Sequence, residues 1–109
     1  MTSQVILRTG ARLRSQVCST EVIVVRPPSR TGSTLTCGGT PLVNIDAPPP
    51  PADAAPASGF AAGNALGKRY TSPTDEALEI LVTKAGSGTL ADGDTPLVVK
   101  PSKALPSSD

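Results

Sequence analysis

The stretch TLTCGGTPLV at residues 34–43 returns as TLADGDTPLV at residues 89–98, with seven of the ten positions identical. Two shorter matches precede it in the same order and at nearly the same spacing: EVIV at 21–24 with EILV at 79–82, and GARL at 10–13 with GKRY at 67–70. Blocks that match in the same order indicate an internal repeat, and such a repeat is a better guide to the fold than the pattern of any single segment. The chain is therefore predicted to hold two copies of one small unit.

Each copy has the pattern of β structure. The runs EVIVVR at 21–26 and EILVTK at 79–84 contain β-branched residues, and a turn, a short second run and Pro-Leu-Val follow each of them. Residues 74–81 are also compatible with a helix capped by Thr74, although the matching run EVIVV is a poor helix former. The predicted fold class is all-β.

The core is expected to be thin and aliphatic, since Phe60 and Tyr70 are the aromatic residues of the chain. Units of about 40 residues rarely bury enough apolar surface to fold alone. We therefore expect two tandem β-hairpin units that pack on each other as a pseudo-dimer. A homo-oligomer is the alternative way to cover the same apolar faces.

A low-complexity segment, DAPPPPADAAPASGFAAGN, begins at Asp46 and separates the two copies. Its prolines cannot donate to a sheet, and its small residues bury little surface. The predicted organisation is a first β unit at 1–45, a disordered Pro/Ala linker at 46–65, a second β unit at 66–100 and a flexible tail at 101–109.

Charge is divided unevenly between the copies. Residues 1–45 carry five arginines and one acidic residue, a net charge of +4, whereas residues 66–109 carry five basic and six acidic residues. A basic face could attract a protein partner of opposite charge. Nucleic acid is a weaker prediction, because no aromatic residues interleave with the arginines. The candidate interaction residues are Arg8, Arg12, Arg14, Arg26 and Arg30.

The N-terminal residues do not have the pattern of a signal peptide, and no run approaches the roughly 18 apolar residues of a membrane span. We therefore expect a cytoplasmic protein without a membrane-spanning segment. In the cytoplasm, cysteines are more often free thiols or metal ligands than permanent disulfides.

The segment LRSQVCSTEVIVV…GSTLTCGGTPLV resembles the desulforedoxin family, the small rubredoxin-like domain that also opens the desulfoferrodoxins. Cys18 matches the second cysteine of the family's first C-x-x-C pair and Cys37 the first of its Cys-Cys pair, and Gly39, Pro41 and Leu42 match its Gly-x-Pro-Met. Ser15 and Gly38 stand where the other two cysteines belong. In the second copy, Glu76 and Asp92 are aligned with Cys18 and Cys37.

This resemblance implies a rubredoxin-like scaffold, dimeric pairing, and iron held by four thiolates for electron transfer. With two cysteines and no histidine in the chain, three interpretations of Cys18 and Cys37 stay open. They are buried relics of a lost metal site, or a reversible disulfide, or half of a four-thiolate zinc or iron site shared by two chains.

No enzyme motif accompanies the cysteines. The chain lacks a histidine base, a G-x-S-x-G elbow and a phosphate-binding loop, and Asp92 and Asp94 are interpreted as turn residues around Gly93. The leading prediction is a non-enzymatic accessory or protein-interaction module without a cofactor. The alternative is a redox or metal-binding protein that uses Cys18 and Cys37.

Overall fold

The structure, a computed structural model, describes residues 7–29 and 34–100. In these ranges every regular element is a β-strand, so the prediction of an all-β fold is confirmed. Within the same ranges no helix has the length and apolar character needed to cross a membrane. The predicted tail at 101–109 and residue Arg30 lie outside the described residues.

The strands of the first half are short. Their bounds are β1 (Arg12–Arg14), β2 (Glu21–Arg26), β3 (Leu35–Cys37), β4 (Thr40–Pro41) and β5 (Val43–Asn44). The strands of the second half follow in the same order: β6 (Arg69–Ser72), β7 (Asp75–Lys84), β8 (Leu90–Asp92), β9 (Thr95–Pro96) and β10 (Val98–Val99).

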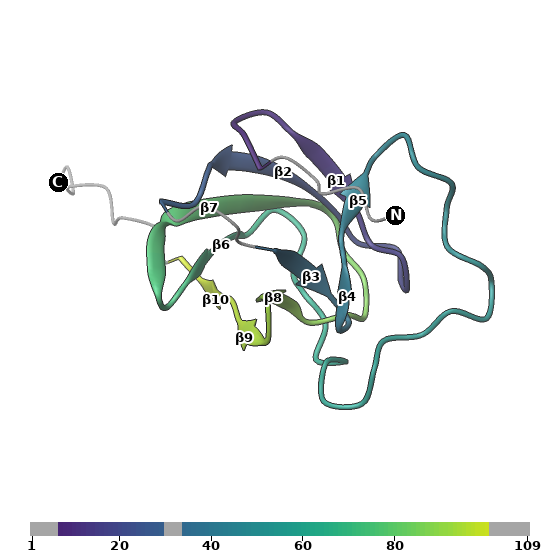
Figure 1. The fold of residues 1–109 in the computed structure, drawn as a ribbon. Coiled ribbons are helices and arrows are strands. Elements are labelled where there is room, and N and C mark those ends of the chain that lie inside the picture. The colour runs from purple at the N-terminus through teal and green to yellow at the C-terminus, as the bar shows by residue number, and fades with distance from the viewer. Residues whose placement is uncertain (1–6, 30–33, 101–109) are drawn as a thin grey trace, which may run out of the picture.

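The strands of the described residues form two antiparallel sheets, one above the other in Figure 1. The larger sheet has the order β10-β6-β7-β2-β1-β5, and the smaller one has the order β4-β3-β8-β9. Each order is symmetric with respect to the sequence repeat, because β2 pairs with its counterpart β7 and β3 with its counterpart β8. The two halves therefore meet along the central pair of each sheet.

The register of these central pairs follows the repeat alignment. In the larger sheet Ile23 lies opposite Leu81, its own counterpart. In the smaller sheet Thr36 lies opposite Ala91, again its counterpart. Equivalent backbone positions thus face one another at the centre of both sheets.

A single buried cluster lies between the sheets and includes residues of both halves. Its largest fully buried apolar side chains come from the central strands and from β1: Leu13, Val22, Val24, Leu78, Ile80 and Val82. Each half thus covers apolar side chains of the other, which explains how two short units bury a shared core.

The alternative prediction of a helix over residues 74–81 is wrong. Strand β7 runs from Asp75 to Lys84, and Leu78, Ile80 and Val82 are buried at every second position. That period of two fits a strand with one face on the core, and pairing with both β2 and β6 satisfies its backbone.

The linker at 46–65 contains no strand, and after β5 it makes a wide excursion before it returns beneath β4 (Figure 1). Residues 56–64 of this linker, which we call the strap, make hydrogen bonds from their backbone to both halves. Three of these hydrogen bonds are Ala57 N to Gly38 O (2.9 Å), Thr89 N to Phe60 O (2.8 Å) and Ala62 N to Thr89 Oγ1 (2.9 Å).

Glu79 is a buried carboxylate on β7, with 3% of its side chain exposed. Lys100 Nζ lies 2.7 Å from one of its oxygens and Arg69 Nη1 lies 3.1 Å from the other. The hydrogen bond from Lys100 outweighs the effect of burial, so the pKa of Glu79 lies below its usual value of 4.5. The carboxylate therefore stabilises the fold in its charged form.

Glu79→Gln is expected to lower the free energy of unfolding by about 2 kcal/mol near neutral pH, because hydrogen bonds to a charged group are lost. A carboxylate with a lowered pKa contributes stability above its unfolded pKa, and this contribution is lost as the pH falls through the folded pKa. Urea unfolding of both proteins near neutral pH and at about pH 3 measures the effect. The difference should shrink in acid, and an undiminished difference would contradict this explanation.

Candidate dithiol site

The structure brings the two cysteines together. Cys18 lies in the loop between β1 and β2, and Cys37 ends β3. Their sulfur atoms are 3.6 Å apart, and both cysteines are free thiols. Cys18 is partly exposed, whereas Cys37 is fully buried. Cys18 is thus the less buried cysteine of the pair.

Ser15 shapes the loop that carries Cys18. Its hydroxyl oxygen accepts the backbone N–H groups of Val17 (3.0 Å) and Cys18 (3.1 Å), which closes a tight turn. The same oxygen lies 3.3 Å from Cys18 Sγ. In this contact Cys18 Sγ is the donor, and the oxygen of the buried Ser15 side chain is the acceptor.

Cys37 is held by the turn that follows it and by the second half of the chain. Gly38 and Gly39 have φ values of +67° and +86°, and they join paired residues Cys37 and Thr40 in a two-residue hairpin loop. Such a loop favours glycine at positions with positive φ. On its other side, Cys37 pairs with Leu90 of β8.

A loop of the second half, residues 85–89, covers both sulfur atoms, and we call it the covering loop. Ser19 Oγ donates to Ala85 O (2.7 Å) at one end, and Gly38 N donates to Thr89 O (3.0 Å) at the other. A Cβ atom added at Gly88 would lie 2.8 Å from Cys37 Sγ and 3.2 Å from Cys18 Sγ. The backbone approaches the sulfurs this closely because Gly88 has no side chain.

The surroundings of Cys18 favour its thiolate. Burial alone would raise its pKa, but hydrogen bonds from the side chains of Ser15 and Thr20, together with backbone groups of Thr20 and Gly88, outweigh it. The pKa of Cys18 is therefore lowered from 9.0 to about 7. Thr20 Oγ1 lies 3.1 Å from the sulfur and is fully buried.

The pKa of Cys37 moves in the opposite direction. Burial is the largest cause, and it raises the pKa from 9.0 to about 11. Near pH 7, about half of Cys18 is thus ionised, whereas Cys37 stays a thiol. A partly buried cysteine with a lowered pKa beside a fully buried cysteine with a raised pKa suits stepwise disulfide exchange.

The site does not fit the metal centre that the family resemblance implies. A structural zinc or iron site needs four converging ligands, and here Ser15 and Gly38 replace two of the cysteines. Over residues 7–29 and 34–100 there is no group of three or more His, Cys, Asp or Glu side chains that could hold an ion. A site shared by two chains would also require displacement of the covering loop, which lies against both sulfurs.

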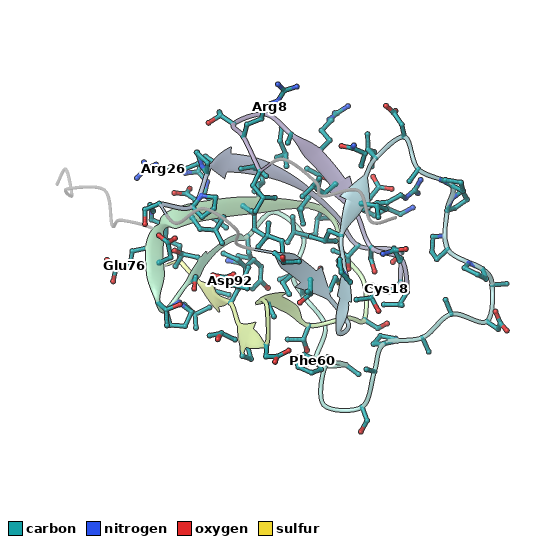
Figure 2. All side chains as sticks on the ribbon, viewed as in Figure 1. Arg8, Cys18, Arg26, Phe60, Glu76 and Asp92 are labelled. Carbon is teal, nitrogen blue, oxygen red and sulfur yellow. The ribbon has the colours of Figure 1, made fainter. Side chains whose placement is uncertain are left out.

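In the second half, the position of Cys18 falls between two aligned points that differ by one residue. Leu13 and Tyr70 hold equivalent ladder positions, and counting forward from them aligns Cys18 with Asp75, whereas counting back from Glu21 and Glu79 aligns it with Glu76. Asp75 is buried, whereas Glu76 is exposed and points away from the protein in Figure 2.

The one-residue difference arises because seven residues separate Thr71 from Glu79, whereas six separate Arg14 from Glu21. Arg14 lies opposite Glu21 in the first half, and Thr71 lies opposite Glu79 in the second. Asp92 does match Cys37, since both end the third strand of their half. Cys37 thus has the buried carboxylate of Asp92 as its counterpart.

The predicted arginine face is only partly assembled. Arg8 and Arg12 line an open groove of about 770 Å³ together with Asn44, Ile45 and Asp46. Arg14 is instead engaged within the fold, where it donates to Ala47 O (3.0 Å). Arg8 and Arg26 lie on the side of the larger sheet, away from Cys18 (Figure 2). The interaction surface stays a prediction.

Sequence reasoning missed several residues of the site. Thr20 gave no signal because a threonine beside a strand is unremarkable, and Asn64 lies in a segment whose composition indicates a linker. Gly86 and Gly88 have the pattern of ordinary turn residues. The repeat alignment was the one signal that could have suggested a contact between this turn of the second copy and the first copy. Tertiary contact between the halves gives these residues their roles.

Comparison of the chain with protein-family models, with curated proteins and with solved structures gives no match.

Gly88→Ala is expected to lift the covering loop, since the added methyl group would lie 2.9 Å from Gly38 N as well as close to Cys37 Sγ. We expect a loss of about 1–3 kcal/mol in stability and faster alkylation of Cys37 in the folded protein. Mass spectrometry of the alkylated protein reports this rate. Ser87→Ala, at an exposed position of the same loop, is the control and should leave the rate unchanged; equal rates for all three proteins would contradict the covering role.

Proposed function

We propose that the protein is a thiol–disulfide redox protein in which Cys18 and Cys37 form a reversible disulfide. The observation that carries this proposal is the 3.6 Å separation of the two sulfurs. A disulfide bond is about 2.05 Å long, so closure requires the sulfurs to approach by about 1.5 Å. Rotation of the Cys18 and Cys37 side chains supplies such a shift while the backbone of the sheets stays in place.

The proposed reaction has two steps. The Cys18 thiolate attacks a low-molecular-weight disulfide of the glutathione type, so that one S–S bond breaks, a mixed disulfide forms on Cys18, and a first thiolate leaves. The Cys37 sulfur then attacks Cys18 Sγ and breaks the mixed disulfide. The proton of Cys37 goes to the second leaving sulfur, which is released as a thiol. The first leaving thiolate takes from water the proton that Cys18 released on ionisation. Overall, the two protein thiols lose two electrons and two protons, and the small disulfide becomes two thiols.

The asymmetry of the pair supports this order. Cys18 is the less buried cysteine and has the lowered pKa, so it is the attacking group. Cys37 is buried with a raised pKa, so it resolves the mixed disulfide rather than starting it. In a cytoplasmic setting, which the sequence favours, such a pair is transient and reports or transfers oxidising equivalents.

We also propose that the scaffold is a duplicated rubredoxin-like unit that has exchanged metal chemistry for thiol chemistry. The symmetric strand order and the facing of equivalent positions support a duplication. The convergence of Ser15, Cys18 and Cys37 supports descent from a site with more cysteines. In this account the serine hydroxyl stabilises the remaining thiolate at the place of a lost ligand.

The proposal is tested by equilibration of the folded protein in glutathione redox buffers. Acid quenching and alkylation of free thiols, followed by intact mass measurement, count the thiols left at each buffer ratio. We expect both thiols to disappear together in one two-electron transition and to return when excess reduced glutathione is added. A protein that keeps both thiols in oxidising buffer, or that accumulates only glutathione adducts, would overturn the proposed function.

A further inference from the structure

The strap ends at Asn64, whose side chain lies between the two halves at the dithiol site. Its amide nitrogen donates to Thr20 Oγ1 (2.8 Å) and to Gly88 O (2.9 Å), and its amide oxygen accepts from Gly86 N (3.2 Å). Both N–H groups and the oxygen are therefore used, which fixes the orientation of the amide. Asn64 connects the first half with the covering loop.

The hydrogen bond to Thr20 decides where the Thr20 hydroxyl hydrogen points. Thr20 is fully buried, so no bulk water competes for the hydroxyl. Its oxygen accepts the Asn64 N–H through one lone pair, which leaves the donor hydrogen and one further lone pair. An ionised Cys18 sulfur can only accept, so toward the thiolate the hydroxyl acts as the donor. Cys18 Sγ lies 3.1 Å from this oxygen and is an acceptor when ionised.

We propose that Asn64 is a positioning residue for the redox reaction: by donating to Thr20 Oγ1, it directs the Thr20 hydroxyl hydrogen at Cys18 Sγ and so holds the attacking sulfur as the thiolate. This inference rests on the proposed function of the dithiol pair and adds the residue that sets its reactivity. It also gives the proline- and alanine-rich segment a role, because docking of the strap brings Asn64 to the site.

Few other groups act on the charge of Cys18. Among the described residues in contact with its sulfur, Cys37 is the titratable one, and it stays protonated near neutral pH. The other neighbours of the sulfur are the hydroxyls of Ser15 and Thr20 and the glycine backbone of the covering loop. Loss of one aligned hydroxyl should therefore be visible in the titration of Cys18.

The test is the pH dependence of Cys18 alkylation by iodoacetamide, measured in Asn64→Ala, in Thr20→Val and in the double variant of the full chain. Each single substitution is expected to raise the midpoint of the pH profile by about one unit, which is about a fivefold fall in the thiolate fraction near pH 7. Because Asn64 acts through Thr20, the double variant should show the shift of Thr20→Val alone. Thr20→Ser keeps a hydroxyl and should retain the wild-type midpoint.

A midpoint unchanged by Asn64→Ala, or a double variant whose shift is the sum of the two single shifts, overturns the positioning role. A purely structural role for Asn64 would lower stability in urea without moving the midpoint. Where Asn64→Ala does not fold, Asn64→Leu replaces it: leucine has a similar size, lacks the donor to Thr20 and adds no charge near Cys18, so an unmoved midpoint again overturns the proposal. Asp53→Ala, at an exposed linker position outside the strap, is the control.

These outcomes are separate from those that test the redox function. Alkylation reports the ionisation of Cys18 whether or not a disulfide forms. A wild-type chain that forms the Cys18–Cys37 disulfide while Asn64→Ala leaves the midpoint unchanged would remove only the positioning role. A wild-type chain that forms no disulfide would remove the redox function, while the midpoint shifts would still show the effect of Asn64 on Cys18.

Discussion

Cys18→Ser is expected to remove the fast reaction of the folded protein with iodoacetamide near pH 7, whereas Cys37→Ser should leave a fast reaction. With a pKa of about 7, roughly half of Cys18 is ionised, and with a pKa of about 11, only about one part in ten thousand of Cys37 is. The more basic thiolate is the better nucleophile, which recovers a factor of roughly 60 over four pKa units. A difference of about 100-fold in rate remains, and burial of Cys37 increases it.

The pH dependence gives this prediction a second test. The fast rate should fall as the pH drops below about 7, because Cys18 becomes protonated, while the slow rate should keep rising well into the alkaline range. Denatured protein is the control, since both cysteines should then react with ordinary thiol pKa values. Similar rates for the two single variants in the folded state would show that the two environments do not differ as described.

Ile80→Ala is expected to lower the free energy of unfolding by about 3 kcal/mol, because it leaves a cavity in the shared core. Ile80 is fully buried on β7 and lies opposite both Val24 of β2 and Tyr70 of β6. For a protein with a total stability of about 5–15 kcal/mol this is a large fraction. The melting temperature should fall by roughly 15 °C.

Leu66→Ala is the matched control for this substitution, because Leu66 is a large apolar residue that is 65% exposed. Its effect should stay within about 0.5 kcal/mol. The two halves are expected to unfold together, since they share one core. Two separate unfolding transitions, or a loss confined to the second half in hydrogen exchange, would contradict a core shared between the copies.

The sequence predicted the all-β class, which the strands confirm, whereas the packing of two repeat copies as a pseudo-dimer stays a prediction. The β-branched runs at 21–26 and 79–84 lie in strands β2 and β7. The expectation that the copies pack together came from the apolar face that each short half cannot bury alone. The sequence could not show that β2 pairs with β7 and β3 with β8, because strand partners depend on tertiary contacts rather than on local pattern.

The candidate site was less visible in the sequence. Cys18 and Cys37 were identified, but the difference between them arises from burial and from hydrogen bonds made after folding. Asn64 illustrates the limit: it follows a proline- and alanine-rich segment that indicates a tether, yet its amide has partners on both halves. Local composition describes how a segment behaves alone, whereas its role here depends on what it docks against.

The intramolecular disulfide is tested most directly by peptide mapping of the folded protein after oxidation by a small disulfide and digestion with trypsin without reduction. Cys18 lies in the tryptic peptide 15–30 and Cys37 in the peptide 31–68. We predict one cross-linked species that joins these two peptides, formed within monomers and lost on reduction. Recovery of both peptides unlinked, or cross-links that join two copies of the same peptide, would contradict the redox function proposed here.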